Sequence, residues 1–219
     1  MKKITIPFFS FPFFCTFARM IDIKWKENVI LVDADYVDKV AFDLTVNFER
    51  MIGRRIPQAD MARWIECVAL DGGMRPTGQG QEARSTQVVF LHRKDKQQMD
   101  NFLPGHYAEA LDGKAFSGEL GEFLISCVPV EEMVTTDDLF VDSLQVIANA
   151  EEVKRLIVIP NAEHIYQRVR EVLRQADDEK RITVLTMQPM EGGNFRQEIL
   201  GYSLMAALGI KSEELSQAR

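Results

Sequence analysis

Cysteine is scarce in this sequence, and the few cysteines that it has are widely separated. The 219 residues include three of them, Cys15, Cys67 and Cys127, and no two form a Cys-x-x-Cys pair. Structural zinc sites and disulfide frameworks both need cysteines at close or paired spacing. The sequence therefore argues against both kinds of site, and reduced, buried thiols are expected instead.

An excess of basic charge is also missing. Lysine and arginine together number 26 against 33 aspartates and glutamates, which gives a formal net charge of −7. Proteins that bind nucleic acid without sequence preference usually carry a broad positive surface. The net charge argues against such a surface, while a local basic groove remains compatible with it.

Residues 1–19 stand apart from the rest of the chain. They combine a basic start, an apolar run and small residues at Thr16 and Ala18, as secretory signal peptides do. The run is too short and too broken by proline for a transmembrane helix, so no membrane partner is expected. In a rival interpretation, translation starts at Met20. The lack of paired cysteines favours a cytoplasmic protein over an exported one, and residues 1–19 are expected to lie outside the fold.

Residues 20–219 are long enough for a single domain with its own core. Short apolar runs without polar alternation predict buried strands of a parallel sheet, and apolar residues at helical spacing predict helices between them. The predicted strands are Val29–Asp33, Gln87–His92, Glu122–Val128, Arg155–Ile159 and Ile182–Thr186. The predicted helices are Val37–Met51, Gln58–Leu70, His106–Leu111, Asp137–Asn149, Ala162–Gln175 and Arg196–Leu208.

Strands and helices alternate along this region, with no internal repeat or low-complexity tract. That order predicts an α/β fold, a three-layer sandwich whose five-stranded, mainly parallel sheet has helices on both faces. We expect Val29–Val32 to be the central strand, between Gln87–His92 and Arg155–Ile159. Ligand sites in such sheets lie at the carboxyl ends of the strands, so the residues that follow each strand are the candidates.

Acidic residues follow the first predicted strand and open the helix after the third. Asp33 and Asp35 end the apolar run, and Asp138 and Asp142 lie four residues apart on one helical face. Clustered carboxylates are hard oxygen ligands suited to Mg²⁺ or Mn²⁺, which activate water and stabilise phosphoryl displacement. In the alternative interpretation, these aspartates cap helices or sit favourably at helix N-termini.

A polar segment, "PNAEH", follows the fourth predicted strand at residues 160–164. Glu163 is a candidate metal ligand, Asn161 an oxygen donor and His164 a proton carrier. In the alternative interpretation, Asn161 is the N-cap of the helix that follows. The basic cluster "RKDK" at residues 93–96 is expected to be solvated loop charge rather than a track for phosphates.

These segments together resemble the NYN/PIN-like nuclease superfamily over roughly residues 28–190. In NYN domains the first strand ends in Asp, and a helix after the third strand opens with a "VD…D" pattern. The fourth strand then runs into a Ser-Gly-Asp-Ser-Asp-Phe motif. Asp33 matches the first of these acids, and Asp138 and Asp142 fall near the second group.

The sequence departs from the NYN pattern at the third motif and near the first. Asn161 and Glu163 stand in place of the two motif aspartates, and Tyr36 stands where an Asn is expected after the first strand. The resemblance implies a divergent ribonuclease that uses Mg²⁺ or Mn²⁺ and acts on RNA. The implied catalytic and metal-binding residues are Asp33, Asp138, Asp142 and Glu163, with Asp35 as a further metal ligand.

Two other interpretations stay open. A non-catalytic descendant of the same fold would bind RNA or a protein partner, or associate into a homo-oligomer. The stretch "VILVDADYV" also resembles the haloacid-dehalogenase-like phosphohydrolases, in which Asp33 would be the nucleophile and Asp35 the acid/base. The other motifs of that class are missing, and Ser126 is the only candidate for its hydroxyl residue.

Overall fold

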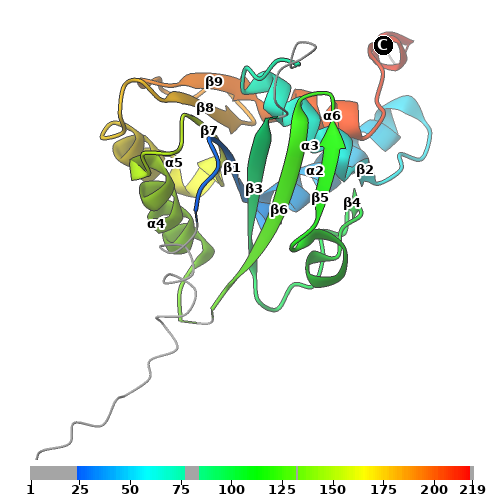
Figure 1. Ribbon diagram of the computed structural model, residues 1–219. Coiled ribbons are helices and arrows are strands. Elements are labelled where there is room, and N and C mark those ends of the chain that lie inside the picture. The colour runs from blue at the N-terminus through cyan, green and yellow to red at the C-terminus, as the bar shows by residue number, and fades with distance from the viewer. Residues whose placement is uncertain (1–23, 77–83, 132, 218–219) are drawn as a thin grey trace, which may run out of the picture.

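The structure, a computed structural model, describes residues 24–76, 84–131 and 133–217. The expectation for residues 1–19 concerns residues outside these described ranges, so it stays a prediction. It is an α/β fold in which one seven-stranded sheet lies between two layers of helices (Figure 1). The strands of this sheet are β1 (Asn28–Asp33), β3 (Ser85–Arg93), β5 (Ala115–Gly118), β6 (Gly121–Val130), β7 (Arg155–Ile159), β8 (Arg181–Thr186) and β9 (Arg196–Ile199). The helices are α2 (Ala34–Ile52), α3 (Met61–Asp71), η1 (Tyr107–Leu111), α4 (Thr136–Asn149), α5 (Ala162–Leu173), α6 (Leu200–Ala207) and α7 (Ser212–Gln217). Two short strands, β2 (Ala59–Asp60) and β4 (Phe102–Leu103), pair separately.

The strand order is β5-β6-β3-β1-β7-β8-β9, and every pair is parallel except β5 with β6. The prediction of a central first strand is confirmed, because β1 pairs with β3 on one side and β7 on the other. Leu31 of β1, for example, lies between Val89 and Val158. Parallel register brings the carboxyl ends of these strands to one edge of the sheet and their amino ends to the other.

The prediction of five strands was wrong by two. Residues 196–199 were assigned to the start of the last helix, but they form β9 beside β8, and α6 begins only at Leu200. Four residues are too few for periodicity to separate a strand from a helical turn. The second addition, β5, lies where no strand or helix was predicted, and it makes a hairpin with β6.

Two hydrophobic cores cover the two faces of the sheet. Along β1, Ile30 and Val32 pack with α2, α3 and α6, while Val29 and Leu31 pack with α4 and α5. Figure 1 shows these two groups of helices on opposite faces of the sheet. Because both faces are covered, every residue of the run is buried, which explains the lack of polar alternation in the sequence.

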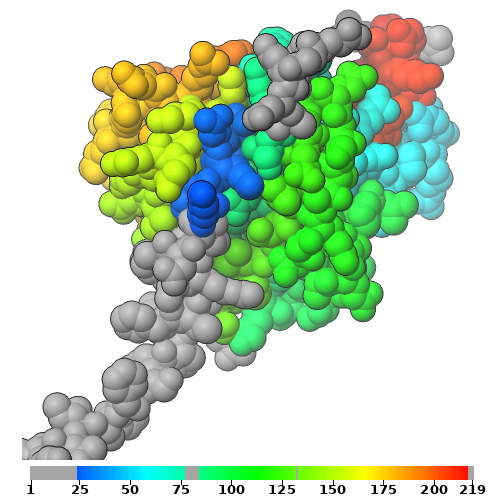
Figure 2. Space-filling model, viewed as in Figure 1, coloured from blue at the N-terminus to red at the C-terminus, as the bar shows by residue number. Residues whose placement is uncertain are grey.

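The start of the described chain enters the fold at the surface. Figure 2 shows it (blue) between the yellow-green α4–α5 side and the green β3–β6 side. Within the described ranges no helix is both long enough and apolar enough to cross a membrane. Cys67 and Cys127 are free and half-buried, and Cys15 lies outside the described residues.

Gly72 gives a test of the packing between α3 and the sheet. Its φ of −66° suits any residue, but an added Cβ would clash with the side chain of Ile157, which is 1% exposed. We expect Gly72→Ala to lower the free energy of unfolding by about 1–3 kcal/mol, the usual cost of overpacking a core. Urea denaturation measures this. Gly192→Ala is the control, because an added Cβ there has nothing within 4 Å, and equal losses in both variants would contradict the prediction.

Candidate functional site

Asp33 lies at the carboxyl end of β1 and is only 3% exposed. Its Oδ1 accepts a hydrogen bond from the backbone N–H of Tyr36 at 3.0 Å, so it caps α2. Burial raises the pKa of Asp33 to about 6, the hydrogen bond from Tyr36 opposes this, and the charges of Asp35 and Asp137 add to it. Asp33 is thus a structural cap whose carboxyl group binds a proton more tightly than usual.

Asp35 and Asp38 hold the loop that follows β3. Asp35 accepts a hydrogen bond from the backbone N–H of Arg93 at 2.8 Å. Asp38, 2% exposed, accepts from Lys96 Nζ at 2.7 Å and from the backbone N–H of Asn101 at 2.9 Å. The expectation that this basic loop is simply solvated was therefore wrong for Lys96, which pairs with a buried carboxylate.

Neither of the two predicted acids of α4 is among the charges that act on Asp33. Asp138 accepts hydrogen bonds from Thr135 Oγ1 at 2.7 Å and from Arg168 Nη2 at 2.8 Å, and these bonds lower its pKa. Asp142 is exposed on the same helix. The α4 residue whose charge acts on Asp33 is Asp137 instead.

The segment after β7 brings its polar groups to the same edge. Asn161 precedes α5 as expected of an N-cap, but its side chain makes no capping bond, and its Nδ2 lies 3.2 Å from Nδ1 of His164. His164 Nδ1 is also 3.7 Å from Oδ2 of Asp137. Glu163 is exposed. Burial of Tyr36 raises the pKa of its hydroxyl group to about 12, and the charge of Glu163 adds to this shift.

The predicted metal ligands do not gather into one cluster within the described part of the chain. Across residues 24–76, 84–131 and 133–217, no three His, Cys, Asp or Glu side chains come together as a metal site. Of the predicted ligands, the structure places Asp33, Asp35 and Glu163 at one edge, and it turns Asp138 toward Arg168. The Mg²⁺ or Mn²⁺ site and its catalytic use stay predictions.

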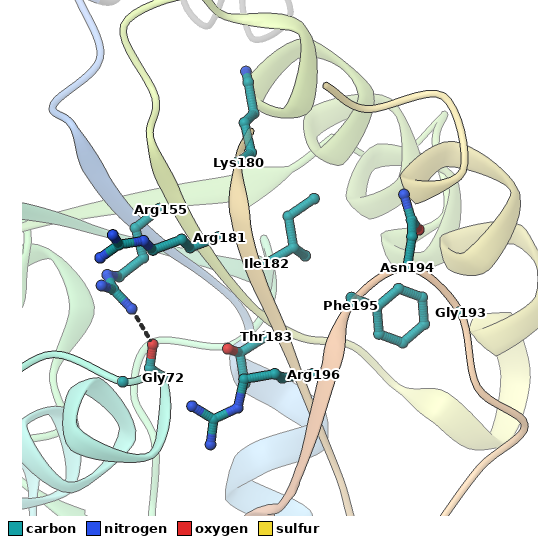
Figure 3. A pocket seen from close by; sticks show the side chains of 11 residues that line it. Gly72, Arg155, Lys180, Arg181, Ile182, Thr183, Gly193, Asn194, Phe195 and Arg196 are labelled. Atoms are coloured by element: carbon teal, nitrogen blue, oxygen red, sulfur yellow. Dashed lines mark hydrogen bonds between the residues drawn. The ribbon is translucent and has the colours of Figure 1, made fainter. Parts of the chain in front are cut away.

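A second candidate site lies at the opposite edge of the sheet. Arg155, Arg181 and Arg196 are the first residues of β7, β8 and β9, so their side chains start from neighbouring strand ends. They line an open pocket of about 560 Å³ (Figure 3). The other lining residues are Gly72, Gly73, Lys180, Ile182, Thr183, Gly193, Asn194 and Phe195.

Positive charge at this pocket is poorly balanced. Burial lowers the pKa of Arg155, and the charges of Arg181, Arg84, Arg196 and Arg75 lower it further. Arg155 itself donates a hydrogen bond to the carbonyl oxygen of Gly72. Within the described residues, only one of these five arginines forms an ion pair, namely Arg196 with Glu198 at 2.5 Å.

The sequence prediction missed this basic pocket because it examined only the carboxyl ends of the strands. A signal was present, since arginine directly opens three segments, "RLIVI", "RITVLT" and "RQEI". The third was assigned to a helix, which hid the repetition. Arg75 and Arg84 carry no such signal, because neither opens a predicted strand.

Comparison with known proteins shows a family without a known activity. The chain belongs to the family of unknown function DUF6621, whose profile matches residues 22–215. No curated protein and no solved structure matches the chain. The function must therefore be argued from the two edges of the sheet.

The raised pKa of Asp33 predicts a pH dependence of stability. The folded state holds this proton up to about pH 6, above the ordinary value of 3.8, so the group's contribution to stability improves as the pH falls from above 6 toward 4. The buried charge costs on the order of 2–3 kcal/mol at pH 8. Asn keeps a carbonyl oxygen for the Tyr36 N–H and has no charge. We expect Asp33→Asn, in chelator-treated protein, to be more stable than the natural chain at pH 8, with little difference at pH 4.

Urea denaturation at the two pH values measures this difference. Asp142→Asn is the matched control, because Asp142 is exposed on α4 and its substitution should change stability little at either pH. A natural protein that is more stable than Asp33→Asn at pH 8 would show that the buried carboxylate contributes more to stability than its burial costs.

Proposed function

We propose that the chain is a non-catalytic binding domain that holds a phosphorylated ligand at the amino edge of its sheet. The observation that carries this proposal is the set of arginines around the pocket. Arg75, Arg84, Arg155 and Arg181 have no carboxylate partner within the described residues, although the protein as a whole has a net charge of −7. Acids are abundant in the sequence as a whole, but among the described residues none forms an ion pair with any of these four arginines.

Such a cluster is unfavourable unless something balances it. Like charges repel, and partial burial of Arg155 weakens the screening by water. Guanidinium groups bind phosphate oxygens through paired hydrogen bonds, and a cleft lined by one sign of charge concentrates ions of the opposite sign. A phosphorylated ligand would therefore relieve the repulsion and stabilise the folded chain.

The carboxyl edge supports a binding role over a catalytic one. Asp33 caps α2, Asp35 accepts a hydrogen bond from the last residue of β3, and Asp138 pairs with Arg168. A likeness to NYN/PIN-like domains is part of the proposal, and the adjacent order β6-β3-β1-β7-β8 of the predicted strands supports it. In this proposal the fold is retained and the metal chemistry is lost.

A divergent Mg²⁺- or Mn²⁺-dependent ribonuclease is the second candidate. One observation favours it, which is that the charges of Asp35 and Asp137 both act on the buried Asp33. A divalent cation near these groups would relieve their repulsion. The phosphohydrolase alternative has less support, because its nucleophile would be Asp33, which is buried and bonded to Tyr36 N–H.

The anion site predicts a stabilisation by phosphates. We expect millimolar pyrophosphate to raise the melting temperature by several degrees, since ligand at about 100 times Kd adds roughly 2.7 kcal/mol of stability. Sodium chloride at the same ionic strength should do much less. Arg181→Gln combined with Arg84→Gln should abolish the shift and leave the ligand-free protein at least as stable, because repulsion at Arg155 is reduced.

Arg63→Gln is the control for this experiment. Arg63 is exposed near the start of α3, whereas the pocket adjoins the end of that helix at Gly72. The control protein should keep the full shift with pyrophosphate. A shift of equal size in the double variant, or none in the natural protein, would reject the proposal.

A metal titration separates the two candidates. For the binding domain we expect millimolar Mn²⁺ to leave the melting temperature unchanged and no cleavage of a single-stranded RNA substrate. For the ribonuclease, Mn²⁺ should raise the melting temperature, support cleavage, and lose both effects in Asp33→Asn. Asp142→Asn completes the set, because it tests whether that exposed carboxylate takes part.

A further inference from the structure

We infer that the ligand of the amino-edge pocket is a small nucleoside phosphate, with a flat heterocyclic ring next to its phosphate groups. This inference rests on the proposed function, because it assigns a chemical class to the ligand of the same pocket. The pocket's volume of about 560 Å³ falls within the range of small-molecule sites, roughly 300–1,000 Å³. Inorganic phosphate alone would leave much of it empty.

The pocket has two chemically different sides. Figure 3 shows the guanidinium groups of Arg155, Arg181 and Arg196 on one side, and Phe195 with Asn194 on the other. A ligand that uses both sides must carry negative charge at one end and a flat, partly apolar group at the other. A nucleotide has these two parts, whereas a simple polyphosphate has only the first.

Phe195 is held in place as a stacking surface. Its ring packs so closely on the backbone of Gly193 that an added Cβ there would clash with it. The ring also contacts the core beneath α4 and α5, yet Phe195 stays partly exposed at the pocket. A ring already fixed by packing loses little conformational freedom when a base stacks on it.

Asn194 adds a polar group beside the ring. Its Nδ2 donates to the carbonyl oxygen of Leu173 at 3.2 Å, and no described donor binds its Oδ1. A carbonyl oxygen fixed in this way can accept a hydrogen bond from a ring N–H or an exocyclic amino group. Hydrogen bonding and stacking together are how proteins usually recognise bases outside a duplex.

Acids around the pocket limit the ligand's length. Glu198 pairs with Arg196 and acts on the nearby Asp71, whose pKa burial raises to about 6. Glu151, Glu152 and Asp177 act on Lys180 at another side of the pocket. A long RNA strand leaving the pocket would meet these negative charges, so a free nucleotide fits better than a polymer.

Calorimetric titration of the full chain with adenosine diphosphate, pyrophosphate and a 10-nucleotide RNA tests the inference. We expect adenosine diphosphate to bind roughly 10-fold more tightly than pyrophosphate, which corresponds to the energy of one stacked base. Phe195→Ala should remove this difference in affinity and leave pyrophosphate binding unchanged. Arg181→Gln should weaken the binding of both ligands. Phe42→Ala, which truncates an exposed phenylalanine of α2, should change neither.

The outcomes separate this inference from the proposed function. Equal binding of pyrophosphate and adenosine diphosphate overturns the nucleotide inference and leaves the phosphate site standing. Absence of binding by all three ligands overturns both. If the RNA binds more tightly than adenosine diphosphate, the inference that the ligand is a free nucleotide rather than a polymer is overturned. Phe195→Leu keeps the apolar packing and removes the ring, so it replaces Phe195→Ala if the latter unfolds.

Discussion

β1 is buried between two hydrogen-bonded neighbours and two helical layers, and its position sets the position of the other strands. Its parallel register with β3 and β7 aligns the ends of all three strands. Asp33 is thereby fixed at the carboxyl edge, and Arg155, paired with Asn28 and Arg181, is fixed at the amino edge. One register thus creates both an acidic edge and a basic one, which apolar packing of the sheet holds apart.

The two edges of the sheet differ in how far their charged side chains are paired within the fold. At the carboxyl edge, side chains such as Asp38 and Asp138 are satisfied by backbone N–H groups or by cations from other segments. At the amino edge, Arg155 and Arg181 have no carboxylate partner among the described residues, although Arg196 pairs with Glu198. Charges already satisfied within the fold have little left to offer a ligand, and unbalanced ones attract it. The usual rule places ligand sites at the carboxyl edge, whereas the phosphate site that we propose lies at the amino edge.

The prediction of secondary structure succeeded where the pattern was local and long enough. The five apolar runs are all strands, and β1 is central, because a run buried on both faces leaves its mark in a few consecutive residues. It failed where pairing with a neighbour decides the conformation. Residues 196–199 are a strand because β8 offers a free edge, and β5 exists because a hairpin folds back on β6.

Hydrophobic runs and chain order were enough to predict the helical layers, the central strand and the acids that end it. Which charged groups meet could not be predicted in the same way, because it depends on how distant segments are arranged in the folded chain. Asp35 bonds to Arg93, 58 residues away, and Asp138 turns to Arg168 on the next helix. The arginines converge because separate strands begin at one edge. Such contacts depend on strand register and side-chain direction, which no local pattern encodes. They decide whether an acid is used within the fold, as a helix cap or in an ion pair, or stays available to a ligand.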